Sequence, residues 1–200
     1  MGDHYFTNNP SVESKPTSFK FTLRGHSFTF KTDQGVFSKS EIDFGSRTLL
    51  ECFKLPAVDG PFLDVGCGYG PIGLSLAKED ENRQVHMVDV NERALSLAEE
   101  NAVLNNVQNV SIYRSDTLHS VKEESFAAIL TNPPIRAGKK VVHDIFEQSF
   151  HKLRNGGELW VVIQKKQGAP SAMDKLEELF GEVEVVGKEK GYYILKAQKC

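Results

Sequence analysis

The sequence has little of several features that mark specialised classes of protein. It has only three cysteines, Cys52, Cys67 and Cys200, and no CxxC pair, so neither a disulfide framework nor a structural zinc site is expected. It has no run of about 18 apolar residues, and residues 1–17 lack the basic-then-apolar order of a signal peptide. We therefore expect a soluble, cytoplasmic protein with no metal and no membrane partner.

Positive charge is also scarce. The 24 lysines and arginines are outnumbered by 27 acidic residues, which gives a formal net charge of -3. Domains that hold nucleic acid by their overall charge have a clear basic excess, so any contact with nucleic acid must be local. With 200 residues, 40% of them hydrophobic, the chain has the size of one globular catalytic domain.

The first quarter of the chain differs in pattern from the rest. Residues 1–17 are polar and without apolar periodicity, which predicts a loose arm. Phenylalanines that alternate with polar residues on both sides of Arg24-Gly25-His26 predict a β-hairpin. Apolar residues between positions 42 and 53 predict a helix that ends near Pro56, with Asp43 or Ser46 as its cap. We group the hairpin and helix as residues 18–55, packing on a main domain of residues 56–200.

Short apolar runs and longer amphipathic stretches then alternate, which is the pattern of a mostly parallel sheet flanked by helices. The last two strands are separated by a short glycine-bounded turn, which favours an antiparallel edge. The expected fold is α/β, a Rossmann-like doubly wound sheet of seven strands preceded by the hairpin. Strands are expected near 61–65, 84–89, 109–114, 125–131, 156–164, 182–188 and 191–198, and helices near 70–79, 91–106, 138–154 and 172–180.

Three alternate glycines, Gly66, Gly68 and Gly70, lie between the first of these strands and the following helix. Bare backbone lets a ligand lie close to the chain. A dinucleotide fingerprint would need a glycine where Pro71 stands, so a nicotinamide oxidoreductase is disfavoured. The spacing fits the GxGxG turn of adenosylmethionine enzymes, in which N–H groups at the helix start suit the methionyl carboxylate. A tight turn without a ligand is the alternative.

Acidic residues follow the next two predicted strands. Asp89 ends the second strand, where a carboxylate can accept hydrogen bonds from ribose hydroxyls. It could instead cap the helix that starts near Asn91. Asp116 follows the third strand, where it could accept from the amino group of adenine, with the backbone of Thr117 contributing, or could be a plain turn residue.

Asn132-Pro133-Pro134 follows the fourth predicted strand. Consecutive prolines cannot continue a strand and disfavour a helix, so the backbone is extended with free carbonyls. An amine on guanine or adenine, or a primary amide, is a poor nucleophile because its lone pair is delocalised. The Asn132 side-chain oxygen and the Pro133 carbonyl could each accept one N–H, which would turn that lone pair toward a methyl donor. In isolation, such a segment is more often a simple turn.

From Gly35 to the carboxyl terminus the chain resembles the small domain family of class I S-adenosylmethionine methyltransferases, and more narrowly ribosomal RNA guanine-N2 methyltransferases of the RsmC type. The motifs that match are GVFSK (35–39), DFGS (43–46), LDVGCGYGPIG (63–73) and NPP (132–134). The resemblance implies S-adenosylmethionine as cofactor, bound by Phe37, Ser38, Asp64, Gly66, Cys67, Gly68, Gly70, Asp89, Val90, Asp116, Thr117 and Asn132. The implied catalytic residues are Asn132, Pro133, Pro134 and Ile135.

In that resemblance Phe37 and Ser38 lie across the cofactor, and Asp64 lies at its methionine end. The implied substrate is ribosomal RNA or a ribosomal subunit. Two features depart from the family: larger RsmC enzymes have a further amino-terminal domain, and Ile135 stands where an aromatic residue is usual. Isoleucine can press on a base but lacks the overlap of an aromatic ring. The alternatives are methylation of a protein glutamine amide or of adenine N6, or a weakly catalytic RNA partner that binds the cofactor.

Overall fold

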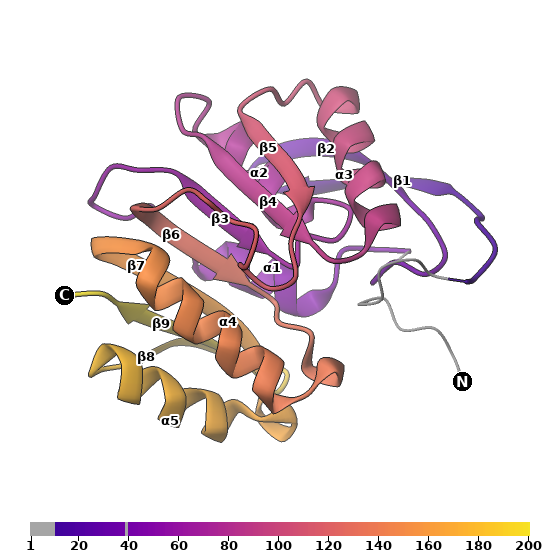
Figure 1. The fold of residues 1–200 in the computed structure, drawn as a ribbon. Coiled ribbons are helices and arrows are strands. Elements are labelled where there is room, and N and C mark those ends of the chain that lie inside the picture. Colours follow the sequence, from indigo (N-terminus) through magenta and orange to yellow (C-terminus); the bar gives the residue numbers. More distant parts are fainter. Residues whose placement is uncertain (1–10, 39) are drawn as a thin grey trace.

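The predicted α/β fold is confirmed by a computed structural model that describes residues 11–38 and 40–200 (Figure 1). A two-stranded antiparallel hairpin precedes a seven-stranded sheet. The strands are β1 (Thr17–Leu23), β2 (His26–Thr32), β3 (Phe62–Val65), β4 (Val85–Asp89), β5 (Val110–Arg114), β6 (Phe126–Thr131), β7 (Leu153–Gln164), β8 (Glu184–Glu189) and β9 (Tyr192–Gln198). The helices are α1 (Phe44–Cys52), α2 (Pro71–Glu79), α3 (Glu92–Leu104), α4 (Lys139–Lys152) and α5 (Ala169–Phe180), with 3₁₀ turns η1 (Ile135–Ala137) and η2 (Lys165–Gln167).

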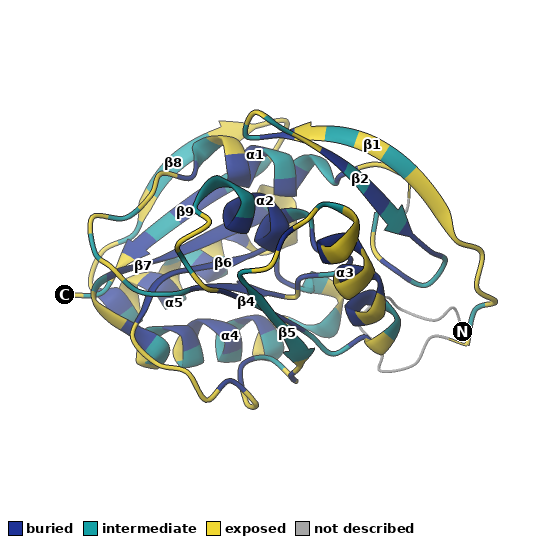
Figure 2. Cartoon of the chain, turned by 90° about the horizontal axis from the view of Figure 1, so that it is seen from above, coloured by how far each residue is buried: buried dark blue, intermediate teal, exposed yellow. Residues whose placement is uncertain are grey.

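The large sheet has the order β5-β4-β3-β6-β7-β9-β8. Strands β3, β4, β5, β6 and β7 run parallel to one another, whereas β9 runs antiparallel to both of its neighbours, β7 and β8. Helices α1, α2 and α3, together with the hairpin, cover one face, and α4 and α5 cover the other (Figures 1 and 2). Two apolar cores therefore lie on opposite sides of the sheet, and the central strands β3 and β6 are buried along their whole length.

The hairpin is held against α3 by two buried or half-buried amides. The Asn101 side chain accepts from the Lys31 N–H (2.7 Å) and donates to the Lys31 carbonyl (2.9 Å). Asn105 makes the same pair of bonds to Thr29, each of 2.9 Å. These amides satisfy the outer edge of β2 as a neighbouring strand would, which protects an edge that could otherwise pair with another chain.

Some element boundaries differ from the prediction. Strand β7 begins at Leu153 rather than near 156, because Leu153 is buried and pairs with Phe126 of β6. Helix α5 begins at Ala169 rather than near 172, since Gly168 precedes it and Pro170 suits a first helical turn. Asp43 is confirmed as the cap of α1, where its carboxylate accepts from the Ser46 N–H.

Residues 1–10 of the predicted arm lie outside the described residues. Within the described part of the arm, Ser14 and the backbone of Lys15 both donate to the Asp33 carboxylate. The division into an arm, a hairpin with its helix, and a main domain stays a prediction. In the ranges that the structure describes, no helix is long and apolar enough to cross a membrane.

The order of the strands determines where a ligand can bind. From β3 the chain first builds β4 and β5 on one side and then crosses to place β6 on the other side of β3. The loops that leave β3 and β6 therefore separate at the carboxyl ends of the strands. In open α/β sheets the crevice at this point is the usual ligand site.

Candidate active site

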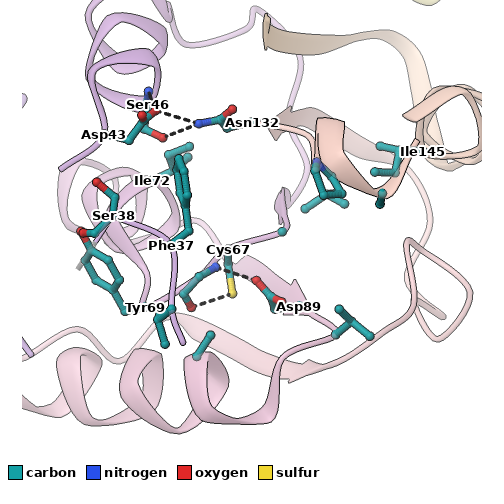
Figure 3. A pocket seen from close by; sticks show the side chains of 18 of the residues that line it. Phe37, Ser38, Asp43, Ser46, Cys67, Tyr69, Ile72, Asp89, Asn132 and Ile145 are labelled. Atoms are coloured by element: carbon teal, nitrogen blue, oxygen red, sulfur yellow. Dashed lines mark hydrogen bonds between the residues drawn. The ribbon is translucent and has the colours of Figure 1, made fainter. Parts of the chain in front are cut away.

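A cavity of about 340 Å³ opens at the carboxyl ends of β3, β4, β5 and β6 (Figure 3). Its volume lies in the range of small-molecule sites. The segments that follow these four strands form its walls, and residues 36–38 and the start of α1 complete it. Of the residues expected from sequence, it brings together Phe37, Ser38, Gly66, Cys67, Gly68, Asp89, Val90, Asp116, Thr117, Asn132 and Pro134.

Gly66 and Gly68 present bare backbone to this cavity. Their φ angles are +74° and +57°, and a Cβ added to either would meet no atom of the described residues within 4 Å. Gly70 is different, because it does not line the cavity and an added Cβ would lie 2.8 Å from Leu74 and 3.1 Å from Met87. Glycine is therefore required at position 70 by packing and backbone conformation, and at 66 and 68 it leaves open space.

Asp64 is buried behind the glycine turn and does not line the cavity. One carboxylate oxygen accepts from the Gly73 N–H at 2.9 Å, and the other has no hydrogen-bond partner in the described part of the chain. Burial raises the pKa of Asp64 to about 7, and the nearby charge of Asp89 adds to the rise. In the structure, the clear contact of Asp64 is with the first turn of α2.

Asp89 lies at the cavity wall. Its Oδ2 accepts from the Gly68 N–H at 2.8 Å and its Oδ1 from the Asn91 N–H at 2.9 Å. Burial raises the pKa of Asp89, although these backbone hydrogen bonds oppose the rise. The cap of α3 is Asn91, whose side chain accepts from the Ala94 N–H, so capping does not account for Asp89. Each Asp89 oxygen can accept a further hydrogen bond.

Asp116 and Thr117 line the cavity beyond β5. The Thr117 backbone is left-handed, with φ of +50°. Its hydroxyl donates to Asp144 at 3.2 Å and accepts from Gln148 at 2.8 Å, so α4 fixes this part of the wall. Asp116 is exposed at the rim.

Residues 36–38 cover one side of the cavity, and Tyr69 holds them there. Phe37 is 39% exposed although it is a large apolar residue. The buried Tyr69 hydroxyl can donate to the Ser38 carbonyl at 3.1 Å or to the Glu41 carbonyl at 3.3 Å. The covering segment is thus tied to the glycine turn. Tyr69 was not identified from the sequence as a residue of the site. Lys39 of the GVFSK motif lies outside the described residues.

Asn132 lies at the end of the cavity, and its side-chain amide is fixed. Its Nδ2 donates to Asp43 Oδ2 at 2.9 Å and to Ser46 Oγ at 3.1 Å (Figure 3). From the sequence, Asp43 and Ser46 were expected only as candidate caps and as part of the DFGS motif. Because Nδ2 already donates to Asp43 and Ser46, the Asn132 Oδ1 is the atom of this side chain that can accept a hydrogen bond from a ligand.

Pro133 and Ile135 do not line the cavity. The Pro133 carbonyl accepts from the Ile135 N–H at 2.9 Å, and Pro134 has φ of -75° and ψ of 80°. These angles make an inverse γ-turn, which leaves the Pro133 oxygen one further lone pair. The Ile135 side chain packs on the core beneath α4 and α5.

Comparison with known proteins identifies the family. The model of the family described as methyltransferase small domain matches residues 27–196. The chain belongs to this family. Its relatives include "Uncharacterized protein YbxB" of Bacillus subtilis, 61% identical over the full length of both chains. Another is the ribosomal RNA small subunit methyltransferase C of Vibrio cholerae, 31% identical over 94% of this chain and 54% of that protein.

The solved structures include the Thermus thermophilus 16S rRNA N2 G1207 methyltransferase RsmC in complex with AdoMet and guanosine. It superposes with a TM-score of 0.83 and 27% identity, over 96% of this chain and 52% of RsmC. The chain thus spans about half the length of these two ribosomal RNA methyltransferases. Small domain methyltransferases of class I use S-adenosylmethionine as methyl donor.

The observed residues fit that cofactor. The open backbone at Gly66 and Gly68 leaves room for it, Asp89 offers hydrogen-bond acceptors, and Phe37 offers an apolar cover. In residues 11–38 and 40–200, no group of three or more His, Cys, Asp or Glu side chains is arranged to hold a metal ion.

Proposed function

We propose that this chain is an S-adenosylmethionine-dependent N-methyltransferase whose target is the exocyclic N2 amine of a guanine in ribosomal RNA. The orientation of Asn132 is the main support, because its Nδ2 is bound to Asp43 and Ser46 and its oxygen is left to accept from an amine. The choice of guanine rests on the similarity to RsmC, which is described in complex with guanosine.

In this proposal the cofactor lies against Gly66, Cys67 and Gly68 at its methionine end, where bare backbone leaves space for it. Asp64 contributes there from beneath the turn, and Gly70 shapes the backbone. The remaining contacts come from the ends of the next strands and from the covering segment. Asp89 with Val90 holds the ribose, Asp116 with Thr117 holds the adenine, and Phe37 with Ser38 lies across the cofactor.

The acceptor amine binds at the NPP segment. S-adenosylmethionine supplies a methyl group made electrophilic by its positive sulfur. The Asn132 Oδ1 accepts one N–H, and the second lone pair of the Pro133 carbonyl accepts the other. With both N–H groups held in this way, the nitrogen lone pair points away from the two oxygens and toward the methyl group. As the new N–C bond replaces the methyl–sulfur bond, whose electron pair stays with sulfur, positive charge grows on the nitrogen and these preorganised oxygens stabilise it. The surplus N–H proton would then leave to solvent. Pro134 and Ile135 fix the turn that aims the carbonyl.

The test is methyl transfer from labelled S-adenosylmethionine to ribosomal RNA and to subunits isolated from cells that lack this protein. We expect label in N2-methylguanosine after digestion to nucleosides. Asn132→Ala should lower kcat at least 100-fold, comparable to removing one preorganised hydrogen-bonding group from an active site. It should leave cofactor affinity within about threefold, because the glycine turn and Asp89 are untouched.

Other products would redirect the proposal. Label in N6-methyladenosine or in a protein glutamine amide would keep the chemistry at Asn132 but replace guanine as target. Cofactor binding without transfer to any acceptor would favour an RNA partner over an enzyme. Absence of cofactor binding in calorimetry would overturn the proposal as a whole.

A further inference from the structure

The Asn132 amide has two nearly isosteric ends of opposite polarity. Its Oδ1 can accept from an amine, whereas its Nδ2 would meet an N–H donor with another donor. The catalytic value of this side chain therefore depends on which end faces the acceptor amine. A rotation of half a turn about the last side-chain bond would exchange the two ends without changing the shape of the site.

The surroundings of Asn132 favour one orientation. Asp43 Oδ2 lies 2.9 Å from Asn132 Nδ2, and an ionised carboxylate can only accept hydrogen bonds. In the rotated state the Asn132 oxygen would face the carboxylate oxygen at this short distance, so an attraction would become a repulsion. The Ser46 hydroxyl, 3.1 Å away, reinforces the contact but can also donate, so it cannot select the orientation alone.

We propose that Asp43 is a positioning residue, whose carboxylate holds the Asn132 amide with its oxygen toward the acceptor amine. This rests on the proposed role of Asn132 in binding that amine. Asp43 and Asn132 are 89 positions apart in the chain, and they meet because the start of α1 lies against the end of β6 (Figure 3).

The fold holds Asp43 itself in place. The same oxygen that accepts from Asn132 also accepts from the Ser46 N–H at 3.0 Å, as the cap of α1. Gly45 lets this helix start approach β9 closely, because a Cβ at position 45 would lie 2.8 Å from the Tyr192 ring. One carboxylate oxygen thus caps the helix and orients the amide.

This double use allows capping and positioning to be separated. In Asp43→Asn, the side-chain carbonyl can stand where Oδ2 stands now, so it can cap α1 and still accept from Asn132. In Asp43→Ser, the hydroxyl is an equally good cap, but it is one bond shorter and loses the contact with Asn132. A capping role alone predicts that the two variants behave alike.

We expect Asp43→Ser to lower kcat on the order of 10- to 100-fold, the usual effect of removing a group that orients a functional side chain. Asp43→Asn should stay within about fivefold of wild type, and Ser46→Ala should fall between the two. The KM for S-adenosylmethionine and the unfolding temperature should change little in all three. Asp174→Ser, at an exposed position of α5, is the control for the same change of charge.

Wild-type kcat in Asp43→Ser, or an equal loss in Asp43→Asn and Asp43→Ser, would overturn the proposal. A second measurement does not depend on the acceptor. The side-chain amide resonances of Asn132, assigned by their loss in Asn132→Ala, should move in Asp43→Ser and stay near their wild-type positions in Asp43→Asn. If the wild-type protein does not methylate ribosomal RNA, the proposed function is wrong. Unchanged Asn132 resonances in Asp43→Ser would refute the positioning role separately.

Discussion

The two glycines at positions 68 and 70 should respond differently to alanine. At Gly68 the added methyl group meets no atom of the described residues within 4 Å, and φ is +57°. A left-handed alanine costs about 1–2 kcal/mol, of which about 0.4–1 kcal/mol is offset by the smaller entropy of the unfolded chain. The net loss should be about 1 kcal/mol, or about 2–4 °C in unfolding temperature for a chain of this size.

Gly70→Ala should be more damaging to the fold. Its φ is +107°, and the new methyl group would lie 2.8 Å from Leu74 and 3.1 Å from Met87, both fully buried. Overpacking of this kind costs about 1–3 kcal/mol, and the strained backbone adds about 1–3 kcal/mol. The expected loss is about 2–6 kcal/mol, or at least twice that of Gly68→Ala.

Cofactor affinity should show the opposite order. The methyl group of Gly68→Ala enters the space that we assign to the cofactor, so calorimetry should show at least a tenfold weaker Kd for S-adenosylmethionine, about 1.4 kcal/mol. Gly70→Ala, measured at a temperature where it is folded, should bind within about threefold of wild type. Wild-type affinity in Gly68→Ala would refute the placement of the cofactor against this turn.

Two further predictions concern Asp64 and Tyr69. Burial raises the pKa of Asp64 from 3.8 to about 7, so ionisation of this carboxyl opposes folding. The contribution of the protonated carboxyl to the free energy of unfolding is complete below pH 4 and is lost as pH rises to about 7. The change is of order 4 kcal/mol. Urea unfolding should therefore show a smaller loss of stability between pH 4 and 7 in Asp64→Asn than in wild type; equal slopes would contradict the burial effect. Tyr69→Phe removes the hydroxyl that holds Ser38 and Glu41. Since one such hydrogen bond contributes about 1 kcal/mol, stopped-flow should show cofactor dissociation a few times faster, with an unfolding temperature at most about 2–4 °C lower. An unchanged dissociation rate would show that the covering segment does not retain the cofactor.

Much of the fold could be predicted from the sequence, because its signals are local. The alternation of short apolar runs with amphipathic stretches indicated all seven strands of the large sheet and their helices. The motifs marked candidate site residues directly after β3, β4, β5 and β6. Because the carboxyl ends of parallel strands lie at the same edge of a sheet, these residues were expected to lie close together. Local patterns were thus enough to place Gly68, Asp89 and Asn132 around one site, and the family resemblance added Phe37; all four line the same cavity.

The sequence predicted the site less well where one motif contains both residues that line the cavity and residues that serve only packing. Asp64 and Gly70 belong to the same motif as Gly66 and Gly68, yet they lie outside the cavity wall. A glycine in the sequence indicates only that a side chain is absent at that position. Whether the missing side chain leaves room for a ligand or for Leu74 depends on how α2 packs on the sheet.

Contacts between distant segments depend on the packing of the whole molecule. The amides of Asn101 and Asn105 fasten the hairpin to α3, and Asp43 meets Asn132 across 89 positions. No periodicity marks such pairs, because propensities and turns act over a few residues. Distant pairs form only when the whole sheet brings their elements together and the two cores bury enough surface to hold them. Local sequence patterns therefore specify which groups gather at the proposed methyl-transfer site, whereas the packing of α1 on the sheet places Asp43 against the Nδ2 end of the Asn132 amide.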